Sequence, residues 1–150
     1  MGRLTELLNL AATRAKDLQL PYSGALTPRE AFEVLQLAPG THLVDVRTRA
    51  EWDWVGRVPN AIEIEWFSYP GSVPNTHFID QLKHAIPTES PVFFMCRSGM
   101  RSSAAAKLAA EAGFLNCYNV LEGFEGDKDT SNHRSSVNGW RASGLPWVQA

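Results

Sequence analysis

The residues with the clearest chemical potential are Cys96 and the seven that follow it, in the segment CRSGMRSS. A cysteine thiolate is a strong nucleophile, and neighbouring cationic groups favour the ionised form. Residues 91–110 contain Arg97, Arg101 and Lys107 and no acidic residue, in a chain whose formal net charge is −2. Positive charge is therefore concentrated where the cysteine lies, which predicts a nucleophilic Cys96.

The same segment separates an apolar run from an alanine-rich stretch, which predicts a strand followed by a helix. Parallel sheets bind ligands at the carboxyl ends of their strands, and the free N–H groups at a helix start attract negative charge. We expect the backbone from Arg97 to Ser102 to form a cradle for an anion. Gly99 would supply the backbone conformation that residues with a Cβ avoid.

Cys117 is the second of two cysteines, and it lies in an apolar stretch without nearby positive charge. The pair has neither the spacing of a Cys-x-x-Cys redox motif nor that of a zinc site. Core packing is the favoured interpretation of Cys117, and a resolving thiol is the alternative.

The elements that must position this segment alternate along the chain. Short apolar or alternating runs predict strands at His42–Arg47, Ala61–Trp66, Pro91–Cys96 and Cys117–Leu121. Capping boxes predict helices that begin at Thr27 and Thr48, and apolar periodicity predicts helices over Thr76–Ile86 and Ser102–Ala112. This order indicates an α/β fold, with a central, mostly parallel sheet flanked by helices on both faces. The tail from Gly123 is expected to be loop-rich, anchored by Trp140 and Trp147.

Residues 1–20 are expected to form an amphipathic helix appended to a domain of residues 21–150. Packing on that domain is the favoured interpretation of the helix, and docking to a partner is the alternative. The proline and glycine that follow, within LQLPYSGAL, indicate a connector.

Composition excludes several classes of function. A chain of 150 residues can bury roughly two-thirds of its unfolded surface, so one domain needs no disulfide or structural metal. A net charge of −2 argues against a nucleic-acid partner. No apolar run approaches the roughly 20 residues needed to cross a membrane, and we expect a cytoplasmic protein with reduced thiols.

Four segments together resemble the rhodanese, or thiosulfate sulfurtransferase, family over about residues 25 to 150: LVDVRTRAEWDWVGRVPNA, FFMCRSGMRSS, GFLNCYNVLEGFEGD and NGWRASGLPW. The resemblance implies a rhodanese-like α/β domain in which Cys96 carries a sulfane sulfur as a persulfide. It also implies that the backbone of Arg97, Ser98, Gly99, Met100, Arg101 and Ser102 forms the cradle. Arg97 and Arg101 would contact the donor anion.

Residues Asp45 and Arg47 match an Asp-Val-Arg pattern of the family, and as alternate residues of a strand they share a face. We expect them to form a supporting charge network rather than to react. The chain departs from many relatives at Arg57, where those have histidine. A pair between Arg57 and Glu51 could preserve the role, although the second capping box already accounts for Glu51.

The implied fold also resembles that of cell-cycle dual-specificity phosphatases and related arsenate reductases. Their motif places five residues between cysteine and arginine, whereas four separate Cys96 from Arg101 here. The shorter loop favours sulfur over phosphate. We expect transfer from a small sulfur oxyanion or persulfide donor to cyanide or a thiol, without a metal or organic cofactor. A persulfide carrier for a protein acceptor, docked through the N-terminal helix, is the first alternative, and a small phosphatase or arsenate reductase the second.

Overall fold

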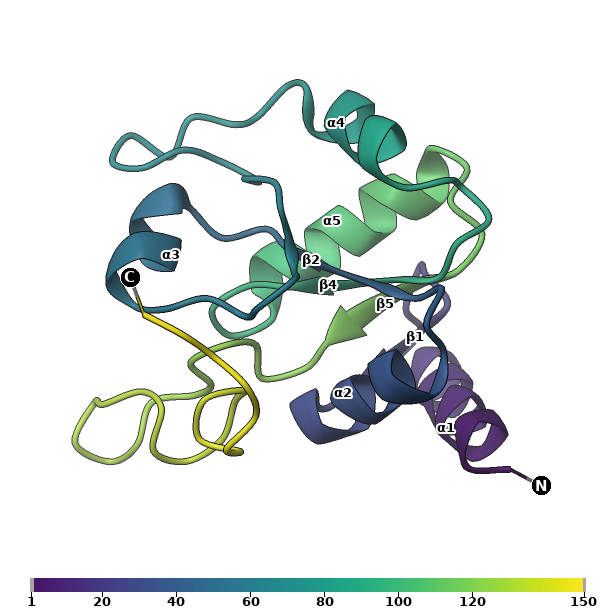
Figure 1. Cartoon of the computed structure of the whole chain (residues 1–150), viewed down its shortest axis with the longest axis horizontal. Helices are drawn as coiled ribbons and strands as arrows, with labels where there is room; N and C mark the ends of the chain where they lie inside the picture. The colour runs from purple at the N-terminus through teal and green to yellow at the C-terminus, as the bar shows by residue number, and fades with distance from the viewer. Residues whose placement is uncertain (1, 150) are drawn as a thin grey trace.

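The computed structural model describes residues 2–149 and contains a five-stranded sheet whose neighbouring strands are all parallel (Figure 1). The strand order is β1-β5-β4-β2-β3. The strands are β1 (Gly24–Leu26), β2 (His42–Asp45), β3 (Ile62–Glu63), β4 (Val92–Met95) and β5 (Cys117–Val120). The helices are α1 (Arg3–Asp17), α2 (Pro28–Leu37), α3 (Arg49–Trp54), α4 (Phe78–Ala85) and α5 (Met100–Glu111). The predicted α/β fold is confirmed.

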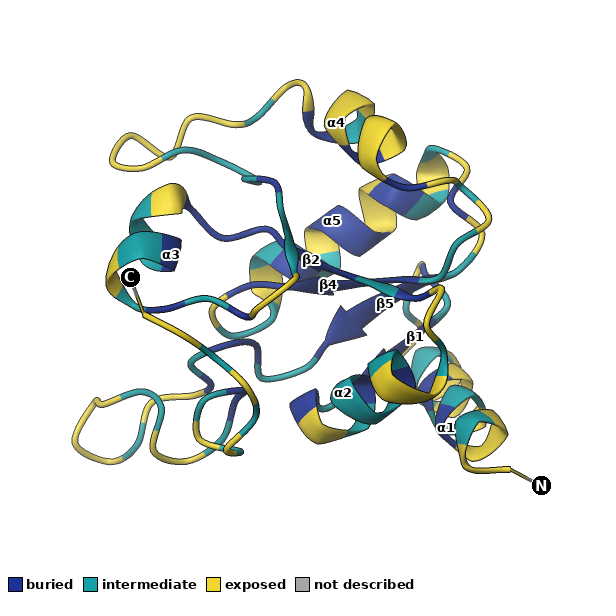
Figure 2. Cartoon of the chain, in the orientation of Figure 1, coloured by how far each residue is buried: buried dark blue, intermediate teal, exposed yellow. Residues whose placement is uncertain are grey.

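Alternate residues of β4 supply the two halves of the core. Val92 and Phe94 pack in the cluster that includes residues of α4 and α5, whereas Phe93 and Met95 pack with residues of α1 and α2. Figure 1 shows these helix pairs on opposite faces of the sheet, and Figure 2 shows that β4 and β5 are buried throughout. A strand covered on both faces needs apolar side chains pointing both ways, which is why this run lacks alternation.

Helix α1 packs on the sheet through its apolar stripe, so the packing interpretation is confirmed. Leu7 and Ala11 are fully buried, and Arg14 pairs with Glu30 of α2. The apolar face proposed for partner docking is therefore occupied by the chain's own sheet. The last three residues of the stretch expected to be a connector instead form β1, where a Cβ at Gly24 would lie 2.6 Å from the Ala11 carbonyl carbon. This glycine allows the close approach of helix and strand.

Both predicted capping boxes are present, with Thr27 and Thr48 as N-caps and Glu30 and Glu51 returning to the cap backbone. Helix α5 begins at Met100, two residues before the predicted start. The expected strand over residues 61–66 is regular only at β3. Its continuation still follows β2, since Ile64 N–H donates to the Asp45 carbonyl over 3.1 Å.

The tail after β5 contains no regular helix or strand within its described residues. Trp140 is fully buried and Trp147 partly buried, as expected for anchors. The ring of Trp140 meets Phe32 of α2 edge to face, with centroids 5.8 Å apart. The tail therefore covers the side of the sheet that carries α2.

Candidate active site

Cys96 directly follows β4, at the carboxyl edge of the sheet, and its loop leads into α5. Gly99 is the N-cap of α5 and has a φ of +115°. This conformation disfavours residues with a Cβ, so the predicted role of Gly99 in the turn is confirmed. Met100, the first residue of α5, is 84% exposed, so its side chain is not packed against the loop.

Two different groups donate hydrogen bonds to the Cys96 sulfur. The Gly99 N–H donates to Sγ over 3.1 Å, and the Ser102 hydroxyl donates to Sγ over 3.3 Å. Cys96 is only 1% exposed. Donors fixed around a buried sulfur stabilise negative charge on it, because no solvent rearrangement is required.

Asn119, in the middle of β5, contacts both residues that donate to the Cys96 sulfur. Its Oδ1 lies 2.6 Å from the Ser102 hydroxyl, and its Nδ2 donates to the Gly99 carbonyl over 3.2 Å. Sequence reasoning did not identify Asn119. The available signal was an amide side chain within an otherwise apolar strand, because buried polar groups need partners.

The turn after β5 holds the other side of the loop. Phe124 N–H donates to the Cys96 carbonyl over 2.8 Å, and Glu125 N–H donates to the Arg97 carbonyl over 3.0 Å. Gly123 has a φ of +67°, and a Cβ there would lie 2.5 Å from the Cys96 carbonyl oxygen. The backbone of the loop and of this turn can approach so closely only because residue 123 is glycine.

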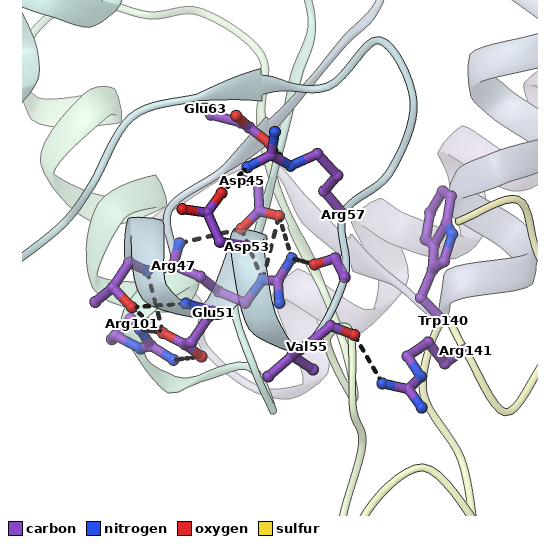
Figure 3. A network of polar contacts seen from close by, with 12 residues as sticks. Asp45, Arg47, Glu51, Asp53, Val55, Arg57, Glu63, Arg101, Trp140 and Arg141 are labelled. Carbon is purple, nitrogen blue, oxygen red and sulfur yellow. Dashed lines mark hydrogen bonds and ion pairs between the residues drawn. The ribbon is translucent and has the colours of Figure 1, made fainter. Parts of the chain in front are cut away.

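The Asp45 and Arg47 side chains form the expected charge network, fully buried beside this turn (Figure 3). Arg47 Nη2 is 2.7 Å from Asp45 Oδ2 and also donates to the Gly56 carbonyl. The Arg47 guanidinium lies 4.1 Å from the centroid of the Phe124 ring. The network therefore supports the turn that contacts Cys96 and does not itself reach the sulfur.

Arg101 is held by Glu51, a pairing that the sequence did not predict (Figure 3). Its Nη1 and Nη2 donate to the two carboxylate oxygens over 2.7 and 3.0 Å. Arg57, raised above as a possible partner of Glu51, instead pairs with Asp53 at 2.8 Å and Glu63 at 3.2 Å. The Glu51–Arg57 interpretation was wrong because the fold places α5, and not residue 57, against the Glu51 carboxylate.

A pocket of about 570 Å³ borders this loop. Arg97 lines it from the loop, Arg101 from the start of α5 and Glu51 from α3, whereas Cys96 is not among its lining residues. The pocket therefore lies beside the cysteine loop, next to a Cys96 that is itself only 1% exposed.

Within residues 2–149, no group of three or more histidine, cysteine, aspartate or glutamate side chains is arranged to hold a metal. Across the same residues, no helix is long and apolar enough to cross a membrane.

Residues 30–130 match the model of the rhodanese-like domain. A parallel α/β domain with a cysteine loop at the carboxyl end of a central strand fits that match, and the chain belongs to the rhodanese-like family. The expected family assignment is thus confirmed.

Three similar proteins illustrate the relationship. The crystal structure of Rv0390 from M. tuberculosis superposes with a TM-score of 0.80 at 44% identity, covering 86% of this chain and 99% of that one. The uncharacterized protein RP600 of Rickettsia prowazekii is 36% identical over 120 residues, which are 79% of this chain and 91% of RP600. The thiosulfate sulfurtransferase GlpE of Actinobacillus succinogenes is 29% identical over 125 residues, 83% of this chain and 90% of GlpE. Of these three, GlpE is named as a sulfurtransferase.

Proposed function

We propose that the protein is a sulfurtransferase that carries a sulfane sulfur on Cys96 as a persulfide. The observation that carries this proposal is the environment of Sγ, which accepts hydrogen bonds from the Gly99 N–H and the Ser102 hydroxyl at the start of α5. Both donors favour a negatively charged sulfur. GlpE, a relative matched over 90% of its length, is named for this class of activity.

In the first step, the Cys96 thiolate attacks the outer sulfur of a thiosulfate or persulfide donor. A new bond forms between Sγ and that sulfur, the sulfur–sulfur bond of the donor breaks, and its electron pair leaves with the remainder of the donor. Burial of Cys96 to 1% exposure keeps bulk water from the product persulfide.

In the second step, a thiolate or cyanide attacks the outer sulfur of the persulfide and leaves the Cys96 thiolate behind. The hydrogen bonds to Sγ stabilise this leaving thiolate as they stabilise the attacking one. The steps require no metal or organic cofactor, and they need a reduced thiol, as in the cytoplasm.

A protein acceptor in place of a small thiol would make the chain a persulfide carrier. The same Cys96 chemistry serves both roles, and the identity of the acceptor separates them. Turnover with cyanide or a small thiol at rates comparable to loading would support the enzyme, whereas stable loading without turnover would support the carrier.

The test is to treat the protein with a sulfane-sulfur donor and map the modified peptide by mass spectrometry. We expect one added sulfur on the peptide containing Cys96 and loss of turnover in Cys96→Ala, with Cys117→Ala as the matched control. A sulfur located on Cys117, unchanged turnover of Cys96→Ala, or Cys96-dependent hydrolysis of an aryl phosphate without persulfide would overturn the proposal.

A further inference from the structure

The charge of Arg101 is already compensated within the protein. Its guanidinium makes a two-point contact with Glu51, and both side chains are mostly buried, with exposures of 16% and 19%. Burial alone would raise the pKa of the Glu51 carboxyl, but hydrogen bonds and charge from Arg101 and the Thr48 N–H outweigh it and hold that pKa below its ordinary value. Glu51 is therefore an anion at neutral pH, and it offers Arg101 a permanent partner.

The pocket consequently has no net positive charge. Its charged lining residues are Arg97, Arg101, Glu51 and Glu125, whose formal charges cancel. A dianion such as thiosulfate would bring two negative charges into partly buried surroundings that already contain two carboxylates. Electrostatic attraction for a dianion is therefore weaker here than the two arginines alone would suggest.

The rest of the pocket is apolar and large. Trp54, Val55, Phe67 and Tyr69 contribute to its lining, and Trp54 and Tyr69 are 80% and 70% exposed. A volume of about 570 Å³ lies within the range of roughly 300–1,000 Å³ that holds organic ligands. Exposed aromatic rings beside a binding pocket gain free energy when an apolar group covers them.

We propose that this pocket selects organic sulfane-sulfur donors with an apolar group and a single negative charge over thiosulfate, and that Glu51 sets the preference. The inference rests on the proposed function and narrows its donor. For a thiosulfonate R–SO₂–S⁻, the Cys96 thiolate bonds to the terminal sulfur, the sulfur–sulfur bond breaks, and its electron pair leaves on the sulfinate R–SO₂⁻. The apolar group R lies against the aromatic lining while this exchange takes place.

Three donors separate the effects of charge and apolar surface. Thiosulfate has two negative charges, methanethiosulfonate has one with a small group, and benzenethiosulfonate has one with an aromatic group. The kcat/KM of persulfide formation for each donor is divided by the rate constant of that donor with free cysteine, which removes intrinsic reactivity. We expect the corrected values to rise from thiosulfate to methanethiosulfonate to benzenethiosulfonate.

Glu51→Gln tests the electrostatic part. Glutamine also serves in a capping box, so the start of α3 is retained while one negative charge leaves the pocket. The corrected preference for methanethiosulfonate over thiosulfate should fall by roughly tenfold. Glu33→Gln is the matched control, because Glu33 also makes a two-point contact with an arginine, Arg3, outside the pocket. It should leave the preference unchanged.

Trp54→Ala tests the apolar part. Since this side chain is 80% exposed, the fold tolerates its loss, and this variant carries the test if Glu51→Gln does not fold. The corrected preference for benzenethiosulfonate over methanethiosulfonate should fall by about fivefold. Leu115→Ala, which removes an exposed apolar side chain outside the pocket, is the control.

The outcomes distinguish the two levels of proposal. If no donor places a sulfur on Cys96, the proposed function itself is wrong. If every donor loads Cys96 but thiosulfate has the highest corrected kcat/KM, or neither Glu51→Gln nor Trp54→Ala changes the preferences, sulfur transfer stands and the donor inference is overturned.

Discussion

The two cysteines lie on neighbouring strands of the same parallel sheet, one at the carboxyl ends of the strands and the other at the amino ends. Cys96 follows the end of β4, whereas Cys117 begins β5 and pairs with Val92 at the start of β4. Both are buried, with exposures of 1% and 0%. Burial is therefore not what distinguishes a reactive thiol from an inert one here.

The difference lies in the groups that each edge presents. At the carboxyl edge, an N–H and a hydroxyl donate to the Cys96 sulfur. At the opposite edge, the Cys117 thiol contacts the Phe114 carbonyl over 3.6 Å, and burial raises the pKa of this thiol to about 12. Strand direction thus decides which cysteine meets helix N–H groups and which meets carbonyl oxygens.

Gly123→Ala should cause the largest loss of Cys96 reactivity. The new Cβ would collide with the Cys96 carbonyl and displace the loop, and misplacement by about 1 Å can cost 100-fold in rate. We expect persulfide formation on Cys96 to fall by about 100-fold or more, as measured by rapid-quench mass spectrometry. Gly113→Ala is the control, because its φ is also positive, at +103°, but nothing lies within 4 Å of its Cβ position. Equal losses in both variants would contradict the explanation.

Ser102→Ala should have an intermediate effect. It removes a donor to the sulfur worth about 1.5–3 kcal/mol when the acceptor is charged, so persulfide formation should slow by roughly tenfold to a hundredfold. Ser103→Ala loses the hydroxyl of the adjacent serine, which bonds to Tyr22 instead. Stopped-flow measurement should find the rate of persulfide formation by Ser103→Ala within about twofold of wild type. A similar loss of rate in Ser102→Ala and Ser103→Ala would show that the Ser102 contact has no specific role.

Cys117→Ala should have the smallest effect, on stability at high pH. The folded-state pKa of about 12 lies above the ordinary value of 9.0, so the neutral thiol contributes stability below pH 9.0 that is lost as the pH rises towards 12. The free energy of unfolding of wild type should therefore decline with rising pH more steeply than that of the variant. By pH 10, the additional loss in wild type should be on the order of 1 kcal/mol. Urea denaturation at several pH values measures this, and parallel slopes would contradict it.

The cysteine loop was predictable because its determinants are local. A doubly covered strand, a glycine and a helix start follow one another within about ten residues, and each has its own sequence signal. The buried pair of Asp45 and Arg47 was predictable for the same reason, since both lie on one strand.

The contacts that complete the site join distant segments, so the sequence did not reveal them. Glu51 and Arg101 are 50 residues apart, and their pairing depends on how α3 and α5 meet. The capping box accounted for Glu51 from local sequence alone, so nothing in the sequence indicated that its carboxylate also pairs with Arg101. Strand β1 was missed because Gly24 was interpreted as part of a connector, whereas a glycine at this position allows α1 to pack closely against the strand.

The Ser102 hydroxyl has one hydrogen and two acceptors, the Cys96 sulfur and Asn119 Oδ1. A negative charge on the sulfur draws the hydrogen towards the sulfur and weakens the hydrogen bond to Asn119. When the thiol is neutral, the hydrogen bond to Asn119 Oδ1 is stronger. The chemical shifts of the Asn119 side-chain amide should therefore change with the charge on the sulfur. In nuclear magnetic resonance spectra, this amide would report each charge state of Cys96 without any label on the cysteine.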